Sequence, residues 1–217
     1  STLMQLIAGL IRPTAGEVLF DNQPIKAISL QEMAKKRAVL SQENELAFPL
    51  LVNEVVMIGR YPHFDSQPNK IDHDICEQAM DLFGIASFKD RNFLSLSGGE
   101  KQRVHFARIT AQILPETDEL KLLLLDEPLT FLDIQYQLLF MNRLKETLLH
   151  KNLIVIGVLH DLNLALKYAD QVLLLRQGKS LAFGKTEDVL NTKNIEAVFG
   201  VIAEKITNIK GQKQLLF

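Results

Sequence analysis

Two short motifs constrain this chain more than any other feature. The first is the run Leu-Ser-Gly-Gly-Glu at residues 96–100, where two glycines behind a serine open an amphipathic helix and leave backbone N–H groups accessible to a phosphate. The second is the apolar run 122–125, followed directly by Asp126 and Glu127. A buried parallel strand delivers carboxylates in this way to its carboxyl end, where open α/β sheets bind ligands. Separately, the motifs could be a glycine turn before an ordinary helix and a core strand with a polar exit. Together they predict an α/β protein that binds a phosphate.

With two further motifs, the chain resembles the nucleotide-binding subunits of ATP-binding cassette (ABC) transporters over essentially its whole length. Residues 96–100 match the signature motif of that family, and residues 122–127 match its Walker B strand. Leu132 and Asp133 match the end of its D-loop, and His160 matches its switch histidine. The resemblance implies an α/β fold with a P-loop NTPase-like, RecA-like core around a parallel sheet, and an inserted all-α helical subdomain.

The composition of the 217-residue chain limits the alternatives. A chain of this length can hold one substantial core, or one core with a small subdomain. The formal net charge is −2 and Lys and Arg are scattered, which argues against a nucleic-acid partner. The single cysteine, Cys76, excludes an internal disulfide and fits a reducing compartment. The longest apolar run, residues 153–159, is far shorter than the roughly 18 residues of a membrane-spanning helix. A role in transport would therefore be peripheral, through a membrane partner.

The chain begins where a P-loop would place its hydroxyl ligand. Residues 1–10 predict a helix, and in a P-loop protein the sequence Gly-Lys-Ser/Thr opens such a helix. Alone, Ser1 would be interpreted as a helix cap. The resemblance implies that Ser1 is the Walker A ligand of Mg²⁺ and Thr2 the next phosphate contact. The glycine loop and its lysine would stand upstream. We therefore expect a piece of a longer protein, and we expect a chain that starts at Ser1 to bind ATP poorly and to be inactive alone.

Residues 43–95 have a different sequence pattern from the rest of the chain, because prolines there separate helical stretches at 52–60 and 72–83. We expect an all-α subdomain over 43–95 that leads into the signature motif. It would be inserted into an α/β core made of residues 1–42 and 96–217, with the start of that core missing. The insertion is short and has no heptad run, which argues against the cassette ATPases of DNA repair, whose insertions are long coiled coils.

The remaining elements alternate between short strands and helices, as in an α/β core. Strands are predicted at 17–20, 38–41, 122–125 and 153–159, and helices at 30–36, 100–112 and 134–150. The run 153–159 is apolar on both faces, as central parallel strands are. Beyond it we predict a helix at 163–168, a hairpin of 171–176 with 180–183, short helices at 187–190 and 194–199, and a last strand.

The resemblance assigns roles to individual residues. Glu127 would orient or deprotonate the attacking water, and His160 would bridge this water and the γ-phosphate. Asp126 would bind Mg²⁺, with Ser1 and Gln42 as the other protein ligands of the metal. Because strand side chains alternate, Glu127 would point elsewhere than Asp126. The residues expected to bind ATP are Ser1, Thr2, Gln42, Ser97, Gly98, Gly99, Glu100 and Asp133. Without the resemblance, Gln42 would be an unremarkable loop glutamine and His160 a satisfied histidine at a strand end.

The resemblance also implies partners. In the family, a head-to-tail homodimer lets the signature residues of one chain cap the nucleotide of the other, and integral membrane permease subunits receive the motion. A substrate-binding protein would take part indirectly, and no nucleic acid would be bound. The segment 59–63, Gly-Arg-Tyr-Pro-His, is similar to subunits of iron-siderophore, haem and cobalamin importers, where it lies near the groove for a coupling helix of the permease. Its alternative interpretation is a helix end with a solvated His63.

We therefore expect the ATP-binding and ATP-hydrolysing subunit of an importer for haem, or for another iron chelate or cobalamin. It would lie peripherally at the cytoplasmic face of the inner membrane. One alternative is a soluble cassette ATPase that clamps nucleic acid or ribosomes, and another is a non-hydrolysing fragment that acts only as a binding partner. The prediction of the cargo depends on segment 59–63 alone, because the ATPase subunit does not contact the cargo.

Overall fold

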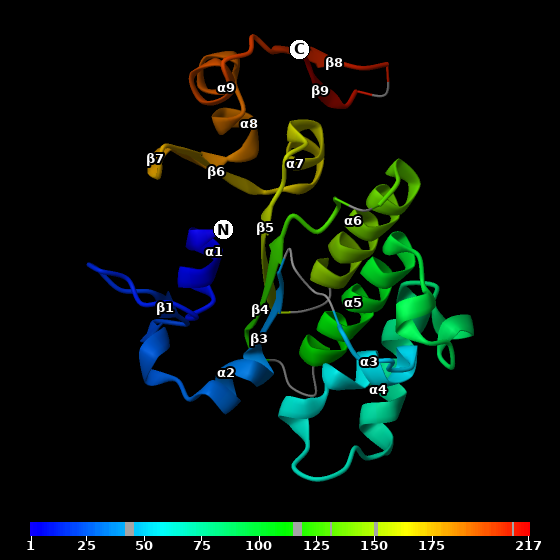
Figure 1. The fold of residues 1–217 in the computed structure, drawn as a ribbon. Coiled ribbons are helices and arrows are strands. Elements are labelled where there is room, and N and C mark those ends of the chain that lie inside the picture. The colour runs from blue at the N-terminus through cyan, green and yellow to red at the C-terminus, as the bar shows by residue number, and fades with distance from the viewer. Residues whose placement is uncertain (42–45, 115–118, 131, 150–151, 210) are drawn as a thin grey trace. The chain divides into compact units, whose positions relative to one another are not determined.

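The computed structural model describes residues 1–41, 46–114, 119–130, 132–149, 152–209 and 211–217. The chain forms two compact units, Ser1–Val158 and Leu159–Phe217 (Figure 1). Each unit has its own secondary structure and its own apolar clusters.

The first unit is built on a parallel sheet of β3 (Arg37–Leu40), β4 (Lys121–Asp126) and β5 (Leu153–Val158), in that order (Figure 1). The central strand β4 is paired on both edges, and its four leucines are buried. A strand in this position has a continuous apolar sequence, as predicted for residues 122–125. The α/β fold class with a parallel sheet is therefore confirmed.

The strand β5 differs from its prediction. Its sequence is apolar on both faces, yet its residues are only half-buried or exposed, and Ile154 is 46% exposed. In the described part of the chain, β5 pairs with β4 alone. An apolar run thus identified a strand correctly, but it did not show which edges and faces of that strand are covered.

Helices cover both faces of β4. Leu122 and Leu124 pack with α1 (Thr2–Ile7), β1 (Leu19–Phe20) and α2 (Leu30–Lys36). Because strand side chains alternate, Leu123 and Leu125 face the other side of the sheet.

The helix α5 (Gly98–Ile113) contacts β3 and β4, and it also packs against α3 (Val52–Ile58) and α4 (Lys70–Leu82). Its Phe106 stacks on Phe140 of α6 (Ile134–Leu149), with ring centroids 3.8 Å apart. These contacts make α5 the helix around which α3, α4 and α6 assemble.

Residues 46–95 are helical. Besides α3 and α4 they contain the 3₁₀ helices η2 (Tyr61–His63), η3 (Ala86–Phe88) and η4 (Phe93–Ser95), and their one β-contact is an isolated bridge between Leu51 and Asn92. The remaining short elements of this unit are β2 (Gln23–Pro24) and η1 (Ile25–Ala27). The predicted division into a helical subdomain over 43–95 and a core of 1–42 and 96–217 stays a prediction.

The second unit begins with α7 (Leu162–Tyr168) and the predicted hairpin of β6 (Gln171–Arg176) and β7 (Lys179–Lys185). Gln177 and Gly178 both have positive φ angles, 49° and 73°, which is the two-residue turn that matches the twist of a hairpin. The elements that follow are α8 (Thr186–Val189), α9 (Thr192–Phe199), β8 (Glu204–Thr207) and β9 (Lys213–Leu216). β8 and β9 form a second hairpin, so the prediction of a single last strand was wrong.

Gly59 allows the close approach of α3 to α5. A Cβ atom at this position would lie 2.1 Å from the carbonyl oxygen of Arg108 on α5, although the backbone itself is in the ordinary helical region. Gly59→Ala must therefore push two helices apart, and we expect it to lower the free energy of unfolding by about 1–3 kcal/mol. Urea denaturation measures this loss. The matched control is Gly157→Ala, where the nearest atoms belong to Leu125 at 3.8 Å, and where we expect a change within about 0.5 kcal/mol. Equal midpoints for the two variants would contradict the close contact.

Candidate active site

The structure brings the first residue of the chain to the end of the central strand. The backbone nitrogen of Ser1 contacts Oδ2 of Asp126, the last residue of β4. The Ser1 hydroxyl caps α1 by accepting a hydrogen bond from the Met4 N–H at 3.3 Å. The side chain of Asp126 is 12% exposed. Ser1 and Asp126, the two described residues that were predicted as metal ligands, are therefore in contact at the carboxyl end of β4.

These two groups fit Mg²⁺ by their chemistry. Mg²⁺ prefers hard oxygen donors, and it is often held by one or two protein groups together with substrate phosphates and water. Among the described residues, no group of three or more His, Cys, Asp and Glu side chains forms a metal site of its own. The part of the site that is described suits a metal ion that arrives with a phosphate ligand.

Glu127 follows Asp126 in a strained backbone conformation. Its φ angle is 52°, in the left-handed region, which costs a non-glycine residue about 1–2 kcal/mol. The Thr130 hydroxyl donates to the Glu127 carbonyl oxygen at 3.1 Å, and Nε2 of Gln102 donates to the Pro128 carbonyl oxygen at 2.7 Å. The sequence suggested that strand alternation sets the direction of the Glu127 side chain. In the structure, the turn beyond the strand sets the backbone conformation of Glu127 instead.

The signature residues open α5 as a capped and exposed helix end. Ser97 is the N-cap: its hydroxyl accepts from the Glu100 N–H at 3.3 Å and donates to Oε2 of Glu100 at 2.8 Å. A Cβ atom on Gly98 would meet nothing within 4 Å. Ser97 and Gly98 are exposed, so this helix N-terminus is accessible to an anion.

Glu100 completes the cap of this helix. The pKa of its carboxyl lies below its usual value, because the Ser97 amide and hydroxyl donate hydrogen bonds to the ionised form. The folded-state pKa is therefore below the unfolded-state pKa. The stabilisation is present at neutral pH and is lost as the pH falls through the folded-state pKa.

Asp133 caps another helix. Its Oδ1 accepts a hydrogen bond from the Tyr136 N–H at 3.0 Å, in the first turn of α6. The preceding loop is held by Nε2 of Gln137, which donates to the carbonyl oxygens of Leu129 and Leu132 at 3.2 and 3.0 Å. The structure thus gives Asp133 a role within the chain, and its contact with ATP across a dimer stays a prediction.

The other predicted site residues are placed less completely. Thr2 is the first residue of α1 and is exposed. His160 belongs to the second compact unit, two residues beyond the end of β5. Gln42 lies outside the described residues. The roles of these three residues stay predictions.

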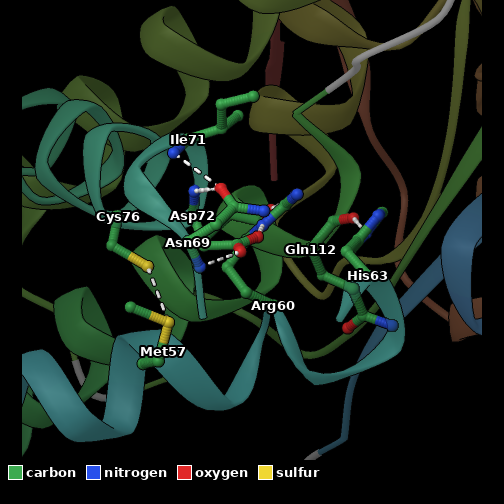
Figure 2. Close-up of polar contacts among 9 residues, drawn as sticks. Met57, Arg60, His63, Asn69, Ile71, Asp72, Cys76 and Gln112 are labelled. Carbon is green, nitrogen blue, oxygen red and sulfur yellow. Dashed lines mark hydrogen bonds and ion pairs between the residues drawn. The ribbon is translucent and has the colours of Figure 1, made fainter. Parts of the chain in front are cut away.

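Segment 59–63 contains a buried ion pair that the sequence analysis missed (Figure 2). Arg60 is fully buried, and its Nε donates to Oδ1 of Asp72 on α4 at 3.0 Å. Its Nη1 donates to the carbonyl oxygen of Ala111 on α5 at 2.9 Å. The sequence signals only the start of α4, where Asn69 and Asp72 have the spacing of a capping box, and it does not signal the pairing of Asp72 with Arg60.

His63 is half-buried in the same region, and its Nε2 lies 2.9 Å from the carbonyl oxygen of Gln112 on α5 (Figure 2). The alternative of a solvated His63 is therefore wrong. Segment 59–63 does not merely end a helix. It connects α3 to the last turn of α5.

A groove of about 340 Å³ opens beside this segment. It is lined by residues of α3 and α4, by Tyr61, and by the loop at residues 89–90. Three carboxylates line it, those of Glu54, Glu77 and Asp90, together with the ammonium of Lys89. Cys76 also lines the groove, and burial raises the pKa of its thiol to about 12, so this thiol is unreactive at neutral pH. The groove is mixed in character, with acidic side chains around apolar walls.

No helix in the described part of the chain has the length and apolar character needed to cross a lipid bilayer.

Comparisons with known proteins agree with these features. The family model described as ABC transporter matches residues 1–130. The hemin import ATP-binding protein HmuV of Escherichia coli O157:H7 is 39% identical over 201 residues, which are 92% of this chain and 77% of that protein. Among solved structures, a metal-chelate type ABC transporter in an inward-facing conformation aligns with a TM-score of 0.79 and 26% identity, over 99% of this chain and 81% of that one. The dimeric ATP-binding cassette MJ0796, bound to ADP and Pi in a post-hydrolysis state, aligns with a TM-score of 0.70 and 25% identity, over 85% of this chain and 79% of that one.

Proposed function

The chain belongs to the ABC transporter family, and from this premise we propose that it is the ATP-hydrolysing subunit of an importer for haem or another iron chelate. One observation supports this function most directly: Ser1 and Asp126 meet at the carboxyl end of β4, with Glu127 next in the chain. The cargo class rests on the relatives, since one is a hemin import protein and another is a metal-chelate type transporter. Neither the net charge nor these relatives favour a clamp on nucleic acid or ribosomes.

In the proposed mechanism, Ser1, Gln42 and Asp126 would hold Mg²⁺, and Thr2 would contact the phosphates. When bound, Mg²⁺ neutralises charge on the β- and γ-phosphates of ATP. Glu127 orients the attacking water and accepts its proton at the carboxylate. His160 contacts the γ-phosphate and the same water.

We extend the proposal to a homodimer in which the signature of one chain caps the nucleotide of the other. The capping residues are Ser97, Gly98, Gly99 and Glu100, with Asp133 at the edge of the same site. The helix dipole of the 16-residue α5 and its exposed N-terminus favour a phosphate at this position. The dimer of the similar cassette MJ0796 supports the arrangement.

The groove between α3 and α4 is the proposed docking site for a coupling helix of the permease. Three carboxylates against the single ammonium group of Lys89 leave the lining with an acidic excess, which favours basic side chains on that helix. The protein would then lie peripherally at the cytoplasmic face of the inner membrane, and a substrate-binding protein would act through the permease.

Growth of a strain that lacks this gene tests the function. With haem as the only iron source, the strain should fail to grow, and the complete gene should restore growth while the Glu127→Gln gene should not. Normal growth on haem with failure on a siderophore would replace haem by that chelate. If the strain fails to grow only when cobalamin must be imported, or if it grows normally on every source, the assignment to iron uptake is overturned.

The Ser97 hydroxyl gives a test of the dimer. Ser97→Ala should weaken ATP-driven dimerisation about tenfold, as measured by light scattering of the protein expressed from its complete gene, because a direct phosphate hydrogen bond contributes about 1.5 kcal/mol. Loss of the helix cap must be separated from this effect. Ser29 forms the same capping box with Glu32 on α2, so Ser29→Ala removes an equal cap and should leave dimerisation unchanged. If the Ser97→Ala and Ser29→Ala variants dimerise equally well with ATP, Ser97 does not contact the nucleotide.

A further inference from the structure

The side chain of Gln102 connects the signature helix to the backbone beside Glu127. Its Nε2 donates to the carbonyl oxygen of Pro128 at 2.7 Å, in a half-buried position. Gln102 lies near the start of α5, and Pro128 directly follows Glu127 in the chain. One hydrogen bond therefore joins the helix that the signature motif opens to the residue that follows the Walker B motif.

This hydrogen bond acts on a strained conformation. Glu127 has a positive φ angle of 52°, and such a conformation persists only where the surroundings hold it in place. The Thr130 bond to the Glu127 carbonyl oxygen is local to the turn. The Gln102 bond, in contrast, comes from another secondary-structure element and holds the carbonyl of Pro128, one peptide unit further along the same turn.

We infer that Gln102 is a positioning residue for ATP hydrolysis: it holds the Pro128 carbonyl and thereby the backbone conformation that aims the Glu127 carboxylate. The inference rests on the proposed function, in which Glu127 acts on the attacking water. Its consequence concerns both nucleotides of a dimer. The N-terminus of α5 would contact the nucleotide of the partner chain, whereas Glu127 serves the nucleotide of its own chain. Gln102 links the N-terminal part of α5 to the turn after Glu127, so nucleotide binding at one site would affect hydrolysis at the other.

Gln102→Met tests the role of the donor. Methionine keeps the length and the helix propensity of the side chain, but it cannot donate a hydrogen bond. In the protein expressed from its complete gene, we expect kcat for ATP to fall about 10- to 100-fold, because a small misplacement of a catalytic group has effects of this size. KM for ATP and ATP-driven dimerisation should stay within about twofold, since the groups that bind ATP are untouched.

Gln112→Met is the matched control on the same helix. Nε2 of Gln112 donates to the carbonyl oxygens of Ala34 and Arg37 at 2.8 and 3.1 Å, so the variant loses the same kind of bond at the other end of α5. It should lower the urea midpoint at least as much as Gln102→Met, with kcat within about twofold of the unchanged protein. An equal loss of kcat in both variants would show that Gln102 acts only through stability, and would overturn the inference.

A double-mutant cycle with Glu127→Gln separates this inference from the proposed function. If Gln102 acts through Glu127, adding Gln102→Met to Glu127→Gln should reduce the residual turnover by less than about twofold. Losses that multiply would overturn the inference and leave Glu127 in place. Unchanged turnover of Glu127→Gln alone would overturn the proposed function of Glu127, and the inference with it.

Discussion

Glu127→Gln is expected to lower ATP turnover by about 10²- to 10⁴-fold, the range associated with loss of a general base. Glutamine keeps the shape of the side chain but accepts no proton at neutral pH. In the protein expressed from its complete gene, ATP should still bind, because Ser1, Asp126 and the signature residues are unchanged. The variant should therefore accumulate as an ATP-bound dimer. Phosphate release measures the turnover, and light scattering with and without ATP measures the dimer.

The matched control for this prediction lies at the other end of the same strand. Glu119 precedes β4 and has an exposed side chain, which forms ion pairs with Lys36 at 3.6 Å and with the buried Lys121 at 4.0 Å. Glu119→Gln makes the same chemical change away from the carboxyl end of the sheet, and an ion pair such as that with Lys36, between partly exposed side chains, contributes about 0–1 kcal/mol. Its turnover should be unchanged. Phosphate release by Glu127→Gln at the rate of this control would remove Glu127 from the mechanism.

Asp72→Ala is expected to produce the largest loss of stability, about 3–5 kcal/mol, because it leaves the guanidinium of Arg60 buried without its counter-ion. The exposed pair of Arg143 and Glu146, at 3.0 Å, provides the comparison. Glu146→Ala should cost less than about 1 kcal/mol. Urea denaturation at neutral pH measures both losses.

The double variant Arg60→Met with Asp72→Leu distinguishes a charge effect from a packing effect. Apolar side chains of similar volume often replace a buried ion pair at little cost, because neither charge then needs to be desolvated. We expect the double variant to recover at least half of the stability that Asp72→Ala loses. A double variant as unstable as Asp72→Ala would show that the hydrogen bonds of this pair, and not its charge balance, hold α4 and α5 together.

Local signals account for the elements that the sequence predicted well. The helix α2 has the predicted bounds, because Ser29 and Glu32 form a capping box that is visible in the sequence. The run 122–125 predicted the buried central strand because a continuous apolar run needs cover on both faces. The meeting of Ser1 with Asp126 followed from the family resemblance, since no local pattern joins residues so far apart in the chain.

Features that depend on distant partners were not predictable. The sequence shows that Arg60 is charged, but its burial depends on Asp72 and Ala111, which belong to other helices. The left-handed backbone of Glu127 likewise depends on the turn around it, because side-chain type alone does not predict a positive φ angle for glutamate.

The contact between Gly59 and Arg108 has a mechanical consequence. It lies off-centre on α5, about 15 Å from Gly98 and about 7 Å from Ile113 along the helix axis, at the usual rise per residue. If α5 rocks about this point as a rigid rod, its signature end moves roughly twice as far as the end that Arg60 and His63 contact. The contact between Gly59 and Arg108 would then be the fixed point of the rotation, with the longer part of α5 on the Gly98 side. A small displacement beside the groove would then become a larger displacement at the Gly98 end of the helix.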